Sequence, residues 1–193
     1  MRVLVLYAHP VETSFSAALH RATVEALTAA GYEVDDCDLY AEKFDPVMSR
    51  QERIDYHDEA LNTKPVQGYV DRLRAAEALV ICCPVWNYSY PAILKGFQDR
   101  VLVPGVSFTL VDGSVWPNLQ HIKKIAAVHT YGGSWFRTFF MGDAPRKAFK
   151  RTLRVLVSPW ARTRYLALYD MNNASEEKRK AFLARVSATM RSF

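Results

Sequence analysis

Three segments of the chain carry residue types that bind phosphates or flat aromatic rings. The first is His9 followed by the hydroxyl-rich turn Thr13-Ser14-Phe15-Ser16. A helix that begins at such a turn offers free backbone N–H groups and the positive end of its dipole, which together favour a phosphate. Hydroxyls before a helix are also ordinary caps, and this alternative applies to Thr13 and Ser14. No Gly-x-Gly-x-x-Gly fingerprint and no Walker lysine accompany the turn, so a Rossmann-type dinucleotide site is not indicated.

The second segment, Val85 to Tyr90, holds three large aromatic residues: Trp86, Tyr88 and Tyr90. It follows the apolar run Ala78 to Cys83, which is short and β-branched as a strand buried on both faces is. The carboxyl end of a parallel strand is where open α/β sheets bind their ligands, so we expect these rings to line a flat ligand. The alternative is that each ring only caps the core. It suits the whole segment less well because Asn87 and Ser89 add exposed polar groups.

The third segment is Thr130-Tyr131-Gly132-Gly133-Ser134. Paired glycines let backbone N–H groups approach a ligand closely. Taken alone, two adjacent glycines after a strand indicate only a turn. The aromatic stretch Trp135 to Met141 comes next, and we expect it to cover the site.

These segments must be positioned by strands that end at one edge of a sheet. Five stretches have the pattern of strands, and helical patterns lie between them. The strand stretches are Arg2 to Ala8, Glu33 to Leu39, Ala78 to Cys83, Lys123 to His129 and Arg164 to Tyr169. This alternation predicts a parallel α/β sheet with right-handed crossovers and helices on both faces. Five strands favour the doubly wound, flavodoxin-like order 2-1-3-4-5 over the six-stranded dinucleotide order. The second strand is polar, so it is expected at an edge.

The helical stretches begin and end at residues with capping character. The helix Ala17 to Ala30 has a cap at Thr13 or Ser14 and a stop at Gly31. Pro91 fits the first turn of the helix after the aromatic segment. The remaining predicted elements are helices at Ser49 to Leu61, from Lys64-Pro65, from an Asp143 cap to about Val157 and from a Ser175 cap, and a hairpin at Val106 to Val115 that turns at Asp112-Gly113.

Length and composition predict a single domain, residues 1–193, because 193 residues of which 50% are hydrophobic can bury one substantial core. The short apolar run after Arg2 is not followed by a cleavage pattern, and no run reaches membrane-spanning length. We therefore expect a soluble, cytoplasmic protein. The three cysteines are odd in number and the five histidines form no ligand set with them, so they indicate buried hydrophobes and no metal site.

The net charge of +5 is concentrated in the last quarter of the chain. Residues 143–193 hold twelve Lys or Arg against four Asp or Glu. Five of these cations share one side of a predicted helix: Arg146, Lys147, Lys150, Arg151 and Arg154. A solvated helix face is the favoured explanation, with an anion site as the alternative. No nucleic-acid-binding motif accompanies the charge.

Several motifs together resemble the NAD(P)H:quinone oxidoreductase family of flavodoxin-like flavoproteins, which includes the ancillary oxidoreductases of bacterial potassium-efflux systems. Most of the chain takes part, and Pro91-Ala92-Ile93-Leu94-Lys95-Gly96 is the most specific motif. The other matching motifs are Leu6-Tyr7-Ala8-His9-Pro10 with Thr13-Ser14-Phe15-Ser16, Asp38-Leu39-Tyr40, Phe44-Asp45-Pro46, Asp99-Arg100-Val101 and Thr130 to Ser134.

The resemblance implies a tightly bound flavin, FMN or FAD, held by the three segments. Its cofactor contacts carry over to His9, Thr13, Ser14, Phe15, Ser16, Pro84, Val85, Trp86, Asn87, Tyr88, Thr130, Tyr131, Gly132 and Gly133. It also implies that NAD(P)H passes two electrons through the flavin to a quinone in a ping-pong cycle. The catalytic loop would be Tyr131, Gly132 and Gly133, whose amides stabilise the reduced flavin. His9 would contact the flavin phosphate.

The resemblance further implies a homodimer with shared sites, in which Phe108 of one copy reaches over the flavin of the other and Trp135 lines the substrate pocket. Well-known family members have a tyrosine and a histidine after the glycine pair. Here Trp135 or Phe136 lies near the tyrosine position and Met141 precedes Gly142-Asp143 where the histidine would fall, so a proton relay through those side chains is not indicated. Two alternatives are a flavodoxin-like electron carrier and a flavin-binding regulatory subunit of a membrane transporter. Carriers meet their partners through acidic surfaces, so a pI of about 9.1 argues against the first.

Overall fold

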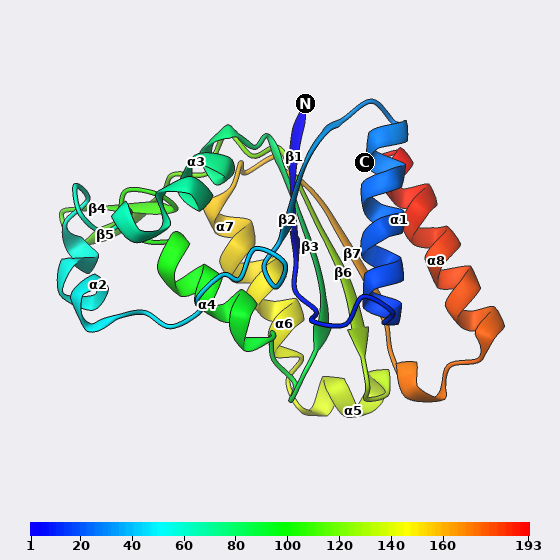
Figure 1. Cartoon of the computed structure of the whole chain (residues 1–193). Helices are drawn as coiled ribbons and strands as arrows, with labels where there is room; N and C mark the ends of the chain where they lie inside the picture. The colour runs from blue at the N-terminus through cyan, green and yellow to red at the C-terminus, as the bar shows by residue number, and fades with distance from the viewer.

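The computed structural model describes all 193 residues of the chain and contains a five-stranded parallel sheet (Figure 1). From edge to edge its strands are β2 (Glu33–Asp38), β1 (Arg2–Tyr7), β3 (Ala78–Val85), β6 (Lys124–Tyr131) and β7 (Arg162–Leu168). Every neighbouring pair is parallel. Since β4 and β5 form a separate hairpin, the predicted order 2-1-3-4-5 is confirmed.

Helices cover both faces of this sheet (Figure 1). On one face lie α1 (Phe15–Ala29) and α8 (Glu176–Arg191). On the other lie α3 (Gln67–Ala75), α4 (Ala92–Val101), α6 (Ala144–Lys147) and α7 (Arg154–Leu156). These helices are too short or too polar for any of them to traverse a lipid bilayer.

Alternate residues of the central strands build two cores, one on each side of the sheet. Along β3, Val80 and Cys82 pack toward α1 and α8, while Ile81 and Cys83 pack toward α3 and α4. This alternation follows from the pleat of a strand, in which successive side chains point to opposite faces. The two adjacent cysteines, Cys82 and Cys83, therefore belong to different cores.

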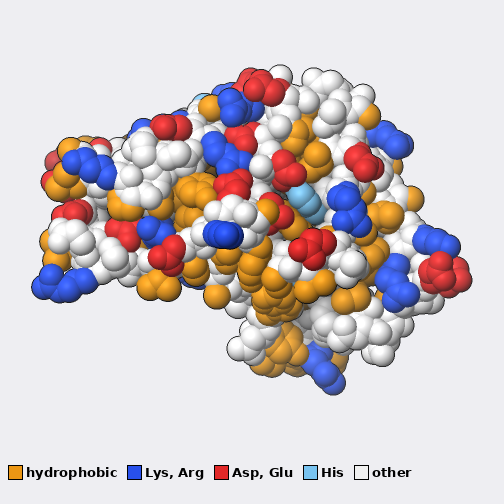
Figure 2. Space-filling model, in the orientation of Figure 1, with side chains coloured by type: hydrophobic (Ala, Val, Ile, Leu, Met, Phe, Trp, Pro, Cys, Tyr) orange, Lys and Arg blue, Asp and Glu red, His pale blue; other side chains and the backbone are white.

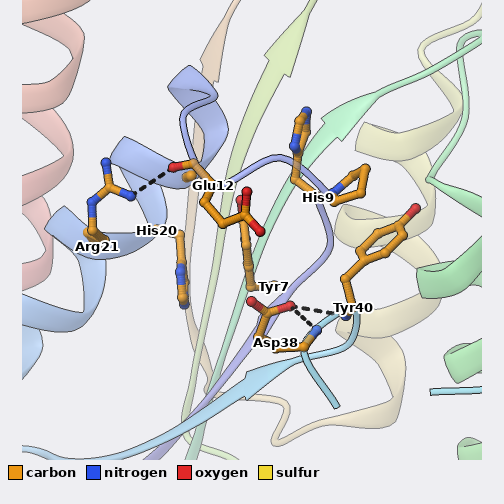
Figure 3. A pocket seen from close by; sticks show the side chains of 10 residues that line it. Tyr7, His9, Glu12, His20, Arg21, Asp38 and Tyr40 are labelled. Carbon is orange, nitrogen blue, oxygen red and sulfur yellow. Dashed lines mark hydrogen bonds between the residues drawn. The ribbon is translucent and has the colours of Figure 1, made fainter. Parts of the chain in front are cut away.

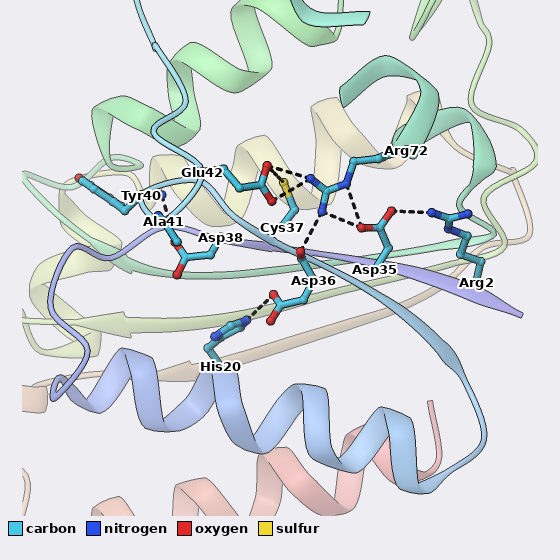
Figure 4. Close-up of polar contacts among 10 residues, drawn as sticks. All are labelled: Arg2, His20, Asp35, Asp36, Cys37, Asp38, Tyr40, Ala41, Glu42 and Arg72. Carbon is cyan, nitrogen blue, oxygen red and sulfur yellow. Dashed lines mark hydrogen bonds and ion pairs between the residues drawn. The ribbon is translucent and has the colours of Figure 1, made fainter. Parts of the chain in front are cut away.

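Ion pairs occupy the polar edge strand β2 (Figure 4). The guanidinium of Arg72 on α3 contacts Asp35 at 2.6 Å and Glu42 at 2.8 Å, and Arg2 contacts Asp35 at 3.0 Å. Burial alone would raise the pKa of Asp35, but hydrogen bonds from Arg72 and Arg2 lower it below its usual value. The strand order places β2 at one edge of the sheet, which confirms the prediction. Charged side chains on such an edge strand also discourage pairing with a strand of another molecule.

The predicted hairpin consists of β4 (Phe108–Val111) and β5 (Ser114–Pro117). Its turn has φ values of 50° at Asp112 and 76° at Gly113, and two consecutive positive values are what a type I′ hairpin turn requires. The hairpin projects to the side of α3 and away from the carboxyl edge of the sheet (Figure 1).

The single helix predicted from Asp143 to about Val157 is wrong in two respects. Its place is taken by α6, a π-helical turn at Ala148–Leu153, and α7. Asp143 stands before α6 with a left-handed φ of 42°, and its side chain makes no capping hydrogen bond. The reason is tertiary, because its carboxylate accepts a hydrogen bond from Tyr131 instead.

Three other helix boundaries differ from the prediction. Ser49 caps α2 (Arg50–Ile54) by exchanging hydrogen bonds with Glu52, but the helix gives way to a 3₁₀ turn at Asp55–His57 instead of reaching Leu61. The Asn62 side chain donates to the carbonyls of Tyr56 and Pro104, both at 3.0 Å, which pulls the chain out of the helical path. Pro91 precedes α4 instead of lying in its first turn, and α1 begins two residues earlier than predicted, at Phe15.

Candidate functional site

The three segments singled out in the sequence meet at the carboxyl edge of the sheet. They follow β1, β3 and β6, which are neighbours in the strand order. The lower end of the sheet in Figure 1 shows these strand ends, with α5 (Trp135–Phe140) beneath them. In an open parallel sheet this edge is the usual ligand site.

Specific contacts join the segments to one another. Ser16 at the start of α1 lies 3.2 Å from Thr130 of β6, oxygen to oxygen. The rings of His9 and Trp86 meet edge to face with centroids 5.6 Å apart. The predicted contact residues Pro84 and Val85 are the last of β3 and lie directly opposite Thr130 and Tyr131 in the sheet register.

The first segment presents free donors at the start of α1. The hydroxyl oxygen of Ser14 accepts from the amide of Ala17, so Ser14, and not Thr13, is the helix cap. No backbone hydrogen bond engages the amides of Thr13, Phe15 and Ser16. These N–H groups and the helix dipole suit an anion.

His9 adds a side-chain hydrogen-bond donor to this segment. Its Nδ1 accepts a hydrogen bond from the Val11 amide at 3.0 Å. Burial lowers the pKa of His9, so the ring is neutral near pH 7. A neutral imidazole that accepts at Nδ1 carries its proton on Nε2, and this N–H is therefore the donor available to a ligand.

The second segment forms a tight turn in which Trp86 and Ser89 exchange backbone hydrogen bonds of 3.1 and 2.9 Å. Asn87 and Tyr88 both have left-handed backbones, with φ values of 48° and 57°. Such a conformation is uncommon for a bulky residue like tyrosine. The prediction for Tyr90 is wrong, because its ring is buried and its hydroxyl donates to the Pro145 carbonyl at 2.8 Å.

The third segment lies beside this turn. A Cβ atom added at Gly133 would lie 3.6 Å from the hydroxyl oxygen of Tyr88, so the tyrosine reaches from the second segment to the third. The amides of Gly132 and Gly133 make no backbone hydrogen bond, while the Gly133 carbonyl accepts from the Asp170 amide at 2.9 Å. Two amide donors of this loop are thus left without a backbone partner.

The side chain of Tyr131 points into the protein and is 1% exposed. Its hydroxyl donates to Asp143 at 2.8 Å and is hydrogen-bonded to the hydroxyl of Tyr165, which also lies 3.0 Å from Nδ1 of the buried His129. Burial raises the pKa of Tyr131 strongly, and the neighbouring Tyr165 and Asp143 raise it further. The side chain of Tyr131 is therefore held inside the protein, so any catalytic role of this loop falls to its backbone amides, as the resemblance implies.

The sequence matches the model of a family described as having a flavodoxin-like fold over residues 1–190. The chain belongs to this family. It is 33% identical over 149 residues to NAD(P)H dehydrogenase [quinone] 1 of Rattus norvegicus, and this match covers 69% of this chain and 54% of that protein. It is 32% identical over 133 residues to the uncharacterized NAD(P)H oxidoreductase YcaK of Escherichia coli (strain K12), covering 68% and 65%. The resemblance found in the sequence is thereby confirmed.

A solved structure of Smu.1420 from Streptococcus mutans UA159 is similar to the flavodoxin-like chain over the full length of both proteins, with a TM-score of 0.86 and 28% identity. The match to the rat dehydrogenase, in contrast, covers about half of that curated relative.

The structure of the flavodoxin-like chain adds a cavity that the sequence did not indicate (Figure 3). It has a volume of about 360 Å³ and lies beside the first segment, and its lining residues are Tyr7, His9, Pro10, Glu12, Ala17, His20, Arg21, Asp38, Tyr40 and Ala41. The rings of Tyr7 and His20 stack at 4.1 Å, and His20 is fixed by Asp36 at 2.7 Å. Burial raises the pKa of Tyr7 to about 12.

The two predicted substrate-pocket residues lie far apart within one chain. Trp135 begins α5 directly after the glycine pair and is 55% exposed. Phe108 lies in the hairpin and lines a different cavity of about 390 Å³ with residues of α4 and of the helical segment after α6. A single chain does not bring Phe108 to the three loops, so the expected contact requires a second copy.

Proposed function

We propose that the protein is a flavin-dependent NAD(P)H dehydrogenase that reduces quinone-type acceptors. The observation that carries the proposal is the convergence of free amides, an aromatic turn and a glycine pair at one edge of a flavodoxin-like sheet. The relatives named as NAD(P)H dehydrogenase [quinone] and NAD(P)H oxidoreductase support it.

The residues present fit a flavin, FMN or FAD. We assign the phosphate to the first segment, where the amides of Thr13, Phe15 and Ser16 have no internal acceptor and His9 offers its Nε2–H. The ring system would lie against the backbone of the second segment, Pro84 to Tyr88, and of the third, Thr130 to Gly133. The closeness of Tyr88 to Gly133, which brings the second and third segments together, supports this assignment.

A bound flavin supplies the two-electron redox chemistry, and the protein supplies placement and electrostatics. The net reaction is NAD(P)H + H⁺ + quinone giving NAD(P)⁺ + hydroquinone, with the two substrates using the same face in turn. The amides of Gly132 and Gly133 would stabilise negative charge that develops on the ring during reduction, as oxyanion donors do. The three buried, unpaired cysteines are in keeping with a reducing cytoplasm.

A homodimer is part of the proposal. Large hydrophobic side chains are exposed in two separate places: Leu110, Val111, Val115 and Trp116 in the hairpin, and Trp135, Phe136, Phe139, Phe140 and Met141 in and after α5. Figure 2 shows the second group as the hydrophobic surface at the lower end of the molecule. A two-fold contact that lays the hairpin of one copy over the loops of the other would cover both groups and bring Phe108 to the partner's site.

Steady-state kinetics test the proposal against its alternatives. Protein reconstituted with FMN or FAD is expected to oxidise NAD(P)H with a soluble naphthoquinone, with parallel double-reciprocal plots. An electron carrier or a transporter subunit would bind flavin without sustained turnover. Absence of bound flavin, together with no flavin-dependent NAD(P)H oxidation after reconstitution, would end the proposal.

A further inference from the structure

A third cavity, of about 410 Å³, lies between α5 and α6. Its lining residues are Trp135, Phe139, Gly142, Asp143, Arg146 and Lys147. The rings of Trp135 and Phe139 lie one helical turn apart and stack with centroids 5.6 Å apart and planes 20° apart. Both are more than half exposed in the single chain, so the cavity has an aromatic wall that one chain leaves open. Flat apolar ligands pack on such a wall.

The opposite side of the cavity is cationic. Neither Arg146 nor Lys147 forms an ion pair with any carboxylate of the chain. The nearby carboxylate of Asp143 is already engaged, since its two oxygens accept hydrogen bonds from Tyr131 at 2.8 Å and Tyr169 at 3.4 Å. The guanidinium of Arg146 lies over the ring of Tyr165, 5.3 Å from its centroid, and this contact leaves its charge without a carboxylate partner. The two cations therefore outnumber the one carboxylate and remain available to an external anion.

This cavity adjoins the third segment, Thr130 to Ser134. Ser134, which follows the glycine pair, caps α5 by accepting a hydrogen bond from the Arg137 amide. The hydroxyl oxygen of Thr138 on α5 lies 3.5 Å from a Cβ atom built at Gly133. The aromatic wall thus begins where the proposed ring site ends.

We propose that this cavity binds a planar aromatic anion, a quinone-like acceptor that carries a carboxylate or sulfonate group. The ring lies on Trp135 and Phe139, and the anionic group is held by Arg146 and Lys147. As a statement about the electron acceptor this rests on the proposed function, whereas binding of the aromatic anion does not. The basic helix face that sequence alone assigns to solvent has, at these two positions, a ligand-binding role.

Binding is tested first without turnover, by isothermal titration of the purified protein with 2-naphthalenesulfonate and with the neutral 2-naphthol. The sulfonate is expected to bind at least about tenfold more tightly, and added salt is expected to weaken it. Lys147→Ala and Arg146→Gln should each lose about three- to tenfold in sulfonate affinity and leave 2-naphthol unchanged. Arg151→Ala removes an exposed cation of the same helical segment outside the cavity and serves as the matched control.

The kinetic arm compares 1,4-naphthoquinone-2-sulfonate with 1,4-naphthoquinone. The KM of the sulfonated quinone should rise in Lys147→Ala with kcat and the neutral quinone unaffected. Equal binding of sulfonate and naphthol by the native protein, or equal losses in Lys147→Ala and Arg151→Ala, would overturn the inference and leave the proposed dehydrogenase intact. Selective binding of the sulfonate without any turnover would support the anion-binding cavity and contradict the proposed dehydrogenase activity. Lys147 is exposed, so its variant is expected to fold even if Arg146→Gln does not.

Discussion

His9 is the side chain whose contribution to the proposed site is most sharply defined. Its Nδ1 is occupied by the Val11 amide, so a ligand can meet only the Nε2–H. A hydrogen bond to a charged phosphate is worth roughly 1.5 to 3 kcal/mol. His9→Ala should therefore weaken FMN binding about ten- to a hundredfold in a fluorescence titration, with turnover largely restored at saturating FMN. The exposed His57→Ala is the control, and unchanged affinity with lost turnover would instead assign His9 to the chemistry.

His129 controls the response of stability to acid. It is fully buried, and burial lowers its pKa to about 3. Between pH 6.5 and 3 the unfolded chain binds a proton at this residue and the folded chain does not, so stability falls as the pH falls. The slope is ~1.4 kcal/mol per pH unit.

Chemical denaturation of the native protein and of His129→Gln at pH 7 and pH 5.5 measures this effect. The loss of stability between the two pH values should be smaller in the variant by about 1 to 2 kcal/mol. Carboxylates titrate mainly below this range, so they contribute little to the difference. Identical losses in both proteins would show that another group carries the pH dependence.

Close packing against Pro46 fixes the position of α4, the helix that follows the aromatic turn. A Cβ atom at Gly96 would lie 2.3 Å from the backbone oxygen of Pro46, a clash that no side-chain movement relieves. Gly96→Ala should therefore destabilise the fold by about 2 to 3 kcal/mol. Gly68→Ala in α3 meets nothing within 4 Å and should cost nothing. Denaturant midpoints of the two variants decide, and equal midpoints would contradict the packing argument.

The start of a helix was predictable from sequence where the capping residue bonds to its own neighbours. The prediction failed where a residue distant in sequence takes the capping side chain. Ser175 caps α8 through its own neighbour, the Lys178 amide, as its sequence context predicts. Asp143 has the same apparent signal, yet its carboxylate is taken by Tyr131, twelve positions away on another element. No spacing rule reports such a contact. Sequence does not predict α5 although Ser134 gives a cap signal, because a helix of six residues, four of them aromatic, is too short to show a helical period.

The sheet order and the three-loop site were accessible from sequence because each loop follows a recognisable strand. The orientation of individual rings was not. The ring of Tyr90 is predicted to line the ligand, but its hydroxyl finds an acceptor inside the protein at Pro145, as that of Tyr131 does at Asp143. Burial raises the pKa of both tyrosines, so the hydroxyls stay protonated and keep these internal bonds.

The proposed dimer is tested by sedimentation at micromolar concentration. The native protein should have twice the mass of one chain. Phe140→Asp places a charge in the exposed aromatic surface of α5 and should yield monomers with reduced quinone turnover. Trp160→Asp is the control, because Trp160 is 90% exposed but lies outside both hydrophobic groups. A native monomer with full activity would refute the dimer.

The most direct test of the account is the affinity of the flavin-free protein for FMN compared with riboflavin, measured by quenching of flavin fluorescence. The two ligands share the ring system and differ in the phosphate. If the free amides after β1 hold that phosphate, FMN should bind at least about tenfold more tightly than riboflavin, and FAD should share the advantage. No binding of any flavin, or equal binding of FMN and riboflavin, would contradict the assignment of the first loop as the phosphate site.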